Sequence, residues 1–509
     1  MRLMTVMSWL VAIGAVGLCG CGSGQVTPKA PAQPFQGVKL TIGAVGDQAI
    51  LQTVAAQRGE WQVTHGADAT IAEVSVDPKA TKGVDVVVFP GDRLGDLVDA
   101  AALVTLPESL VRLAPKKVAD LAPESTASEP LPNPLQFNDV VTAYRDQVTR
   151  YGMNDRLALP YGGSALVVVY RREALEGESN LSAAKEVGIK LEPPQTWTQL
   201  DALAKFLHGR DWDGDGEPES GVAIVLAADP EGLGEAIFLA RAAALGQHPF
   251  HYSFLFDADT MEPRIATPPF VEALRALTSL KAFSPSGVRG FDAETAREAF
   301  RSGKVGLLID RAEEAARWTD PKQPLKVGVA ALPGSDRVYE PTRKAWEPAS
   351  PPNRPSYLPR GGGWLVGVAA ASSGRQREAA LDFIRYLTSP DTSRRILADR
   401  AFPMLPVRTS QLGQGLPDPR SAPGVVGRQW SRAVTETLTA PRVVPGLRIP
   451  EAEAYLADLG RARAKVLEGA PVESALEDVA RAWAERTQRL GKDRQLWHYR
   501  RSLNTLATA

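Results

Sequence analysis

The sequence is poor in cysteine and has no excess of charge of either sign. Only two cysteines occur in 509 residues, Cys19 and Cys21, both at the start of the chain. The body of the protein therefore has neither a disulfide framework nor a cysteine-based metal site. The 58 basic residues balance the 59 acidic ones to a net charge of -1. Because nucleic-acid binding needs basic charge to offset phosphates, we expect no nucleic-acid partner.

Long apolar runs and catalytic constellations are also missing. After residue 18 no stretch reaches the roughly 20 apolar residues that a membrane-spanning helix needs. Ser182 and Lys185 match the S-x-x-K spacing, but no K-T-G partner follows. His248 and His251 lack a third histidine nearby, so loop residues are the better interpretation than metal ligands. We therefore expect no enzyme.

What is present begins with an export signal over residues 1–20. Arg2 precedes a short apolar run that ends in small residues, as in a secretory signal peptide. The end of this run resembles the bacterial lipoprotein box, with Leu18 and Gly20 placed for modification of Cys21. Residues 21–36 are rich in Gly, Pro, Ala and Gln and predict a flexible, lipidated tether. The alternative is plain secretion with an incidental cysteine.

The body alternates strand and helix patterns. Residues 84–89 and 166–170 are dense β-branched runs, typical of strands covered on both faces. Residues 199–207 form an amphipathic helix that Thr196 and Gln199 can open as a capping box. Alternation of this kind predicts an α/β fold, and the length allows about two to four domains or lobes.

A series of motifs runs through the body in a fixed order. They lie at residues 83–96, 159–172, 193–200, 299–309, 361–365, 379–388 and 402–408. The series resembles the extracellular solute-binding proteins of ABC importers, in the carbohydrate-binding family that includes maltose-binding protein. The resemblance implies the periplasmic-binding-protein type II fold, in which two α/β lobes are joined by hinge crossings around a ligand cleft.

On that pattern the domain boundaries can be drawn. Lobe 1 is expected at residues 37–161 and lobe 2 at 162–331. Residues 332–363 would return to lobe 1 and carry a Pro-rich insertion. Residues 364–509 would supply the rest of lobe 2 and the C-terminal helices. A second Pro-rich loop is expected at residues 123–134.

A sugar cleft needs aromatic rings for the C–H faces of the ligand and charged groups for its hydroxyls. Some residues of both kinds fall where the family lines its cleft. Asp310 and Arg311 depart from the family pattern but leave a strand at its carboxyl end, the usual ligand side of an open α/β sheet. The candidates are Asp47, Asp92, Arg93, Tyr161, Asp310, Arg311, Trp364 and Trp430. Two alternatives stay open: Asp92 and Arg93 can form a surface salt bridge, and Asp47 can cap a helix.

An acidic loop follows the spacing of a calcium site. Asp211, Asp213, Asp215 and Glu217 alternate, and Gly216 allows the sharp turn at the sixth position. The twelfth position is Val222 rather than a bidentate Glu, so a solvated turn is the alternative. Apart from this possible structural calcium, we expect no cofactor.

Together these features predict a lipid-anchored, monomeric protein outside the cytoplasmic membrane. It would capture a mono- or oligosaccharide and deliver it to an ABC permease by hinge closure. The alternative is a receptor or scaffold with the same fold that signals without transport.

Overall fold

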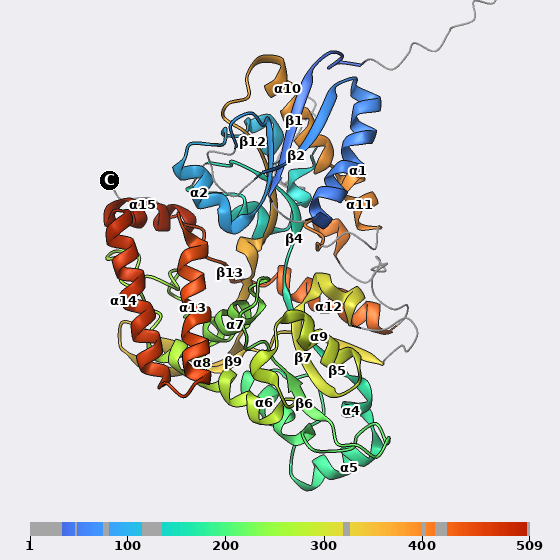
Figure 1. Cartoon of the computed structure of the whole chain (residues 1–509), viewed down its shortest axis with the longest axis vertical. Coiled ribbons are helices and arrows are strands. Elements are labelled where there is room, and N and C mark those ends of the chain that lie inside the picture. Colours follow the sequence, from blue (N-terminus) through green and yellow to red (C-terminus); the bar gives the residue numbers. More distant parts are fainter. Residues whose placement is uncertain are drawn as a thin grey trace, which may run out of the picture.

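The computed structural model describes residues 33–45, 48–74, 81–113, 135–153, 155–318, 326–398, 404–412 and 425–505. The predicted export signal at residues 1–20, Cys21, Asp47 and the predicted loop at 123–134 lie outside the described residues. The chain forms two α/β lobes, one above the other in Figure 1. None of the helices in the described residues is both long and apolar enough to cross a membrane.

Lobe 1 is built on a five-stranded sheet in the order β2-β1-β3-β12-β4. Its strands are β1 (Lys39–Val45), β2 (Asp68–Val74), β3 (Val86–Pro90), β4 (Leu159–Gly163) and β12 (Gly363–Val368). β1 runs parallel to β2 and β3, and β12 runs antiparallel to β3 and β4. The helices are α1 (Gln48–His65), α2 (Leu94–Asp99), α3 (Glu108–Val111), α10 (Gly374–Leu387) and α11 (Pro390–Leu397). Trp61 of α1 donates its indole N–H to Asp382 of α10 at 2.9 Å, which ties these two helices together.

Lobe 2 is built on a four-stranded sheet in the order β6-β7-β5-β8. Its strands are β5 (Leu166–Arg171), β6 (Ser220–Ala223), β7 (Val305–Arg311) and β8 (Val327–Ala331). Every residue of β5 and β7 is buried, as the β-branched runs predict. The helices are α4 (Arg172–Glu176), α5 (Glu178–Glu186), α6 (Trp197–Leu207), α7 (Leu233–Gly246), α8 (Pro268–Ser279), α9 (Ala293–Arg301) and α12 (Val425–Leu438). The predicted capping box of Thr196 and Gln199 is present at the start of α6.

Two segments belong to a different lobe from the one that the sequence predicts. β12, α10 and α11 belong to lobe 1, although the family pattern predicts residues 364–509 to form lobe 2 and the C-terminal helices. Backbone pairing is the reason, because Trp364 to Val368 pair with β3 and β4. The Pro-rich insertion forms a hairpin of β9 (Ser335–Glu340) and β10 (Ala345–Asn353), here called the arm. It packs on lobe 2, where Asn353 donates to the carbonyl of Ala244 in α7 at 2.7 Å.

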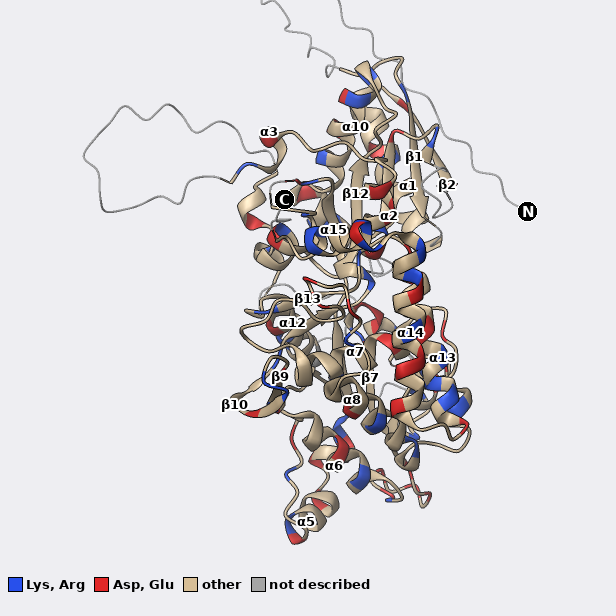
Figure 2. Cartoon of the chain, turned by 90° about the vertical axis from the view of Figure 1, so that its left-hand side faces the viewer, with Lys and Arg blue, Asp and Glu red and all other residues tan. Residues whose placement is uncertain are grey.

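The C-terminal helices contact both lobes (Figure 1). They are α13 (Ala452–Leu467), α14 (Val472–Leu490) and α15 (Lys492–Ser502). Tyr499 Oη accepts from the backbone N–H of Phe254 and of Phe256, in lobe 2, at 3.1 and 3.2 Å. His498 Nδ1 lies 3.0 Å from Tyr151 Oη in lobe 1. Acidic and basic residues are interspersed along α13 and α14, as the balanced composition leads us to expect (Figure 2).

Candidate functional site

The two lobes meet where the chain crosses between them. One crossing runs from β4 into β5. Another returns from the arm to β12 through the short strand β11 (Ser356–Leu358). β11 pairs in parallel with β13 (Val443–Pro445), which leads from α12 toward α13. This junction is where the family pattern predicts the ligand, so its buried polar groups are the ones to account for.

Asp92 brings a carboxylate to the junction from lobe 1. It lies in the 3-10 turn Gly91–Arg93, directly after β3, at the carboxyl end of a parallel strand, which is the usual ligand side of an open α/β sheet. Its Oδ1 is buried and has no hydrogen-bond partner among the described residues. Burial raises the pKa of Asp92, and the positive charges of Arg93 and Arg360 only partly oppose this. An unpaired buried oxygen costs free energy, so it calls for a function.

Glu235 brings a second carboxylate from lobe 2. It lies in the first turn of α7. One oxygen, Oε1, is 3.0 Å from Arg463 Nη1, whereas Oε2 is buried without a hydrogen-bond partner among the described residues. Tyr357 of β11 lies within electrostatic range of both acids: its pKa is raised by burial first, and then by the charges of Asp92 and Glu235. One carboxylate from each lobe is thus near enough to Tyr357, on a crossing strand, to raise its pKa.

A buried pair fastens the β4–β5 crossing. Ser164 Oγ donates to Glu313 Oε1, and the backbone N–H of Ala165 lies 3.4 Å from Glu313 Oε2. Burial raises the pKa of Glu313, and the charge of Arg311 and the bond from Ser164 lower it less. Glu235, Tyr357, Ser164 and Glu313 are absent from the predicted site, because no local motif distinguishes them from other polar residues.

The other candidates at the junction differ in their partners. Arg93 is ion-paired with Glu453 of α13 and lies 3.7 Å from Asp96. Its contact with a ligand stays a prediction. Tyr161 and Trp364 lie on the neighbouring strands β4 and β12, and both are 5% exposed. Burial raises the pKa of Tyr161. Their position suits apolar walls of a cleft, and their contact with a ligand stays a prediction.

Asp310 and Arg311 belong to a buried ionic network within lobe 2. Asp310 accepts from Arg297 Nε and Nη2, both at 2.8 Å, and from the Trp318 indole N–H at 2.9 Å. Arg311 donates to Glu231 Oε2 at 2.8 Å. The groups that were predicted to bind a ligand are therefore occupied by protein partners, and the structure gives their ligand role no support.

Trp430 is buried in α12 and donates its indole N–H to the carbonyl of Ala312 at 2.8 Å. This bond fastens α12 to the turn that follows β7. A stacking role for Trp430 stays a prediction.

The acidic loop brings together a different fourth residue from the predicted one. Carboxylate oxygens of Asp211, Asp213, Asp215 and Glu219 lie within 4.8 Å of one another, and Glu217 is not part of the group. Glu219 is buried, and its pKa is raised by burial and by the three neighbouring aspartates. Calcium at this loop stays a prediction, with Glu219 in place of Glu217 as the fourth ligand.

Comparison with known proteins identifies the family. Residues 56–413 match the family described as bacterial extracellular solute-binding protein. The chain belongs to this family. No curated protein gives a significant match in sequence.

Solved structures of solute-binding proteins share the fold of this family member. An ABC transporter solute-binding protein from Agrobacterium radiobacter K84, in complex with ribitol, is 21% identical. The match covers 89% of this chain and 100% of that one, with a TM-score of 0.62. The sugar-binding protein MalE from Xanthomonas citri is 15% identical over 89% of this chain and 99% of its own, with a TM-score of 0.60. A solute-binding protein from Agrobacterium vitis S4 with bound D-mannitol is 18% identical over 89% and 99%, with a TM-score of 0.58.

Proposed function

We propose that this solute-binding protein captures a carbohydrate or sugar alcohol between its lobes and delivers it to an ABC permease. Family membership supports extracytoplasmic solute capture rather than catalysis. The similar structures with ribitol and mannitol support a polyhydroxylated ligand. No observation favours the signalling receptor.

The observation that carries the proposal is the pair of unpaired carboxylate oxygens at the junction. Asp92 Oδ1 comes from lobe 1 and Glu235 Oε2 from lobe 2, and both are buried. Ligand hydroxyls can donate to both, and hydrogen bonds to charged acceptors are among the stronger ones. Contacts of this kind with both lobes exist together only in the closed arrangement, so a ligand shifts the population toward it.

The proposed site of action is outside the cytoplasmic membrane, with the monomeric protein held by acylation of Cys21. The lipoprotein-like sequence around Cys21 and the tether of residues 21–36 support this. Two or more acyl chains give stable anchoring, whereas one is marginal.

The test is a thermal-shift and calorimetric screen of the full-length chain against ribitol, mannitol and maltooligosaccharides. A ligand at 100 times its Kd adds about 2.7 kcal/mol to the stability of the folded state. Asp92→Asn and Glu235→Gln should each weaken the response. Glu178→Gln, on the exposed face of α5, is the matched control and should leave it unchanged. No response from any compound in the screen would count against a polyhydroxylated ligand, and a full response from both variants would remove the carboxylates from the site.

A further inference from the structure

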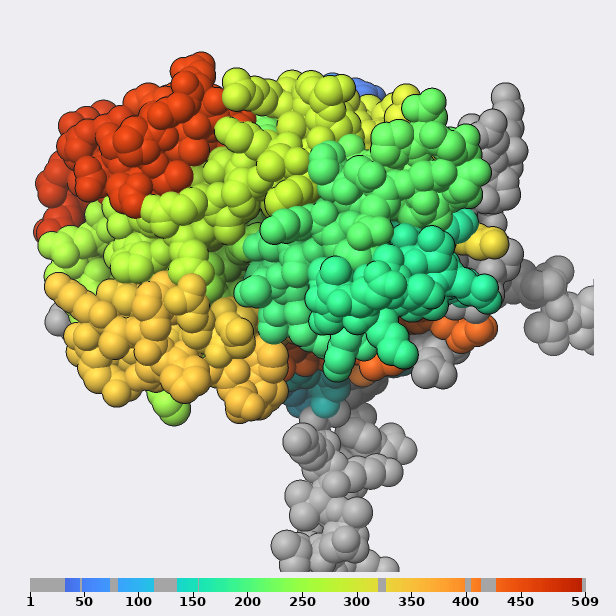
Figure 3. Space-filling view, turned by 90° about the horizontal axis from the view of Figure 1, so that it is seen from below, coloured from blue at the N-terminus to red at the C-terminus, as the bar shows by residue number. Residues whose placement is uncertain are grey.

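Lobe 2 carries a large groove beside the junction. Its volume is about 1240 Å³, and it lies between the arm, the segment before α6, and α12. In the view from below, the arm (gold) lies beside the green segment before α6 (Figure 3). A hydrogen bond joins the two, because Arg354 donates to Gln195 Oε1 at 2.9 Å. Neither Asp92, Glu235 nor Tyr357 lines it. Ligand pockets usually measure about 300–1,000 Å³, so this groove can hold more than one sugar unit.

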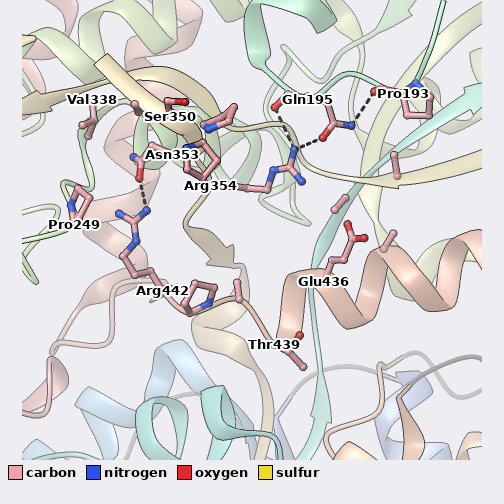
Figure 4. A pocket seen from close by; sticks show the side chains of 18 of the residues that line it. Pro193, Gln195, Pro249, Val338, Ser350, Asn353, Arg354, Glu436, Thr439 and Arg442 are labelled. Atoms are coloured by element: carbon pink, nitrogen blue, oxygen red, sulfur yellow. Dashed lines mark hydrogen bonds between the residues drawn. The ribbon is translucent and has the colours of Figure 1, made fainter. Parts of the chain in front are cut away.

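Two arginines in the groove have only neutral partners. Arg354 donates to the side chain and the carbonyl of Gln195, at 2.9 and 3.2 Å. Arg442 donates to the carbonyl of Gln247 at 3.1 Å and to the Asn353 side chain. Figure 4 shows both guanidinium groups at this cavity, each with its amide partner. Neither forms an ion pair with any described residue, and burial lowers the pKa of both.

Three acidic residues line the groove, Glu192, Glu347 and Glu436, and none of them forms an ion pair with Arg354 or Arg442; Glu192 is exposed. Glu436 accepts from Arg432 Nε at 2.8 Å. Glu347 lies 3.2 Å from His248 Nε2 and is also paired with Arg343. Arg354 and Arg442 thus keep positive charge and unused N–H donors, which suit a carboxylate.

The walls favour sugar rings over a peptide backbone. Six prolines line the groove: Pro193, Pro249, Pro348, Pro351, Pro352 and Pro441. Prolines present C–H faces and lack the backbone N–H that would pair with an added peptide strand. Phe250, which also lines the groove, is 88% exposed and offers a ring for stacking on a sugar.

From these observations we propose that the groove is a second binding site, for a carboxylate-bearing oligosaccharide such as a short uronic-acid chain. Carboxylates would meet Arg354 and Arg442, hydroxyls would meet the amides of Gln195 and Asn353, and ring faces would rest on the prolines and Phe250. The site differs from the Asp92 and Glu235 site in its lining residues and in the charge of its ligand.

The test is calorimetric titration of the full-length chain with trigalacturonate, maltotriose and a pentaglutamate peptide. Trigalacturonate should bind and maltotriose should not bind at the groove. Arg354→Gln and Arg442→Gln should each raise the Kd for trigalacturonate at least tenfold, and Arg442→Lys should give a smaller rise, since lysine keeps the charge but loses the planar fork. Arg432→Gln is the matched control, because Arg432 lines the same groove but is already paired with Glu436. The Kd of this variant for trigalacturonate should stay within twofold of the wild-type value.

Three results would overturn the proposal. The first is the absence of heat with trigalacturonate. The second is equal or tighter binding of pentaglutamate, which would make the groove a site for acidic peptides. The third is loss of trigalacturonate binding in Asp92→Asn with retention in Arg442→Gln, which would place the ligand at the lobe junction. Thermal unfolding of each variant confirms that it is folded before its affinity is compared.

Discussion

Two aspartates lie where a strand ends, one in each lobe, and their surroundings differ: Asp310 is fully buried, whereas Asp92 is partly buried. Asp310, in lobe 2, has both oxygens bonded, to Arg297 and to the Trp318 indole. Asp92, in lobe 1, keeps a buried Oδ1 with no hydrogen-bond partner in the described part of the chain. The sequence offers both as ligand groups, since both lie where a strand ends.

The difference separates a group that stabilises the fold from one that is ready for a ligand. A buried charge with complete partners contributes to the structure only as long as each partner remains. A buried charge without a complete set of partners destabilises the free protein and gains most when a ligand supplies the missing bonds. Four substitutions test this comparison.

The largest effect should come from Asp310→Asn. It leaves the guanidinium of Arg297, which is fully buried, without its full counter-charge. Removing one partner of a buried ion pair usually costs about 3–5 kcal/mol. Urea denaturation at pH 7 measures the loss, and a change below about 1 kcal/mol would contradict the structural role of Asp310.

Glu231, in the same network, should make the free energy of unfolding depend on pH in the acidic range. Burial opposes its charge, but the ion pairs with Arg297 and Arg311 outweigh burial and lower its pKa to about 2. This contribution is therefore present above the unfolded pKa of about 4.3 and is lost as the pH falls toward 2. At pH 7, Glu231→Gln should lower the unfolding free energy by on the order of 2 kcal/mol.

The pH dependence of that variant provides its own control. The difference between wild type and Glu231→Gln in urea denaturation should shrink steadily from pH 5 to pH 2. A difference that stays constant over this range would show that the carboxylate charge is not its source.

Asp92→Asn should act on binding rather than on folding. The substitution removes a hydrogen bond to a charged group. For the tightest-binding compound of the sugar and polyol screen, the binding free energy should become less favourable by about 1.5–3 kcal/mol, which raises the Kd roughly tenfold to a hundredfold. Because burial raises the pKa of Asp92, the folded state holds this proton more tightly than the unfolded chain, so this group adds stability as the pH falls. The ligand-free variant should accordingly be as stable as wild type at pH 7, or more so; a large loss of stability would make Asp92 resemble Asp310.

The smallest effect should come from Thr196→Ala, which removes the cap of α6. Its hydroxyl accepts from the backbone N–H of Gln199 at 3.2 Å. Loss of such a cap typically costs about 1 kcal/mol. Because α6 lies away from the junction, affinity for the sugar or polyol should not change, so this variant separates a loss of stability from a loss of binding.

Local patterns predicted much of the fold and part of the site. The capping box at Thr196, the buried runs of β5 and β7 and the position of Asp92 after β3 all depend on residues close together in sequence. The placement of β12 in lobe 1 could not be read in this way, since it depends on pairing with strands more than 190 residues earlier along the chain.

The site itself shows the same limit. Glu235 is one of several acidic residues at helix starts, and Tyr357 follows a Pro-rich segment with no motif. Only the folded chain places Tyr357 near both Asp92 and Glu235. Similarly, the sequence marks a Pro-rich insertion within residues 332–363 but does not show that the arm and α12 enclose a groove.

By itself, then, the sequence determined the family, the alternation of strands and helices, and the types of residue available to bind a solute. Periodicity, capping and ordered motifs are local, and local interactions suffice to specify them. The tertiary structure alone decided which charged groups are satisfied, because partners such as Arg297 and Trp318 reach Asp310 only after the chain has folded. That is why Asp310 and Asp92 look alike in the sequence and differ in the protein.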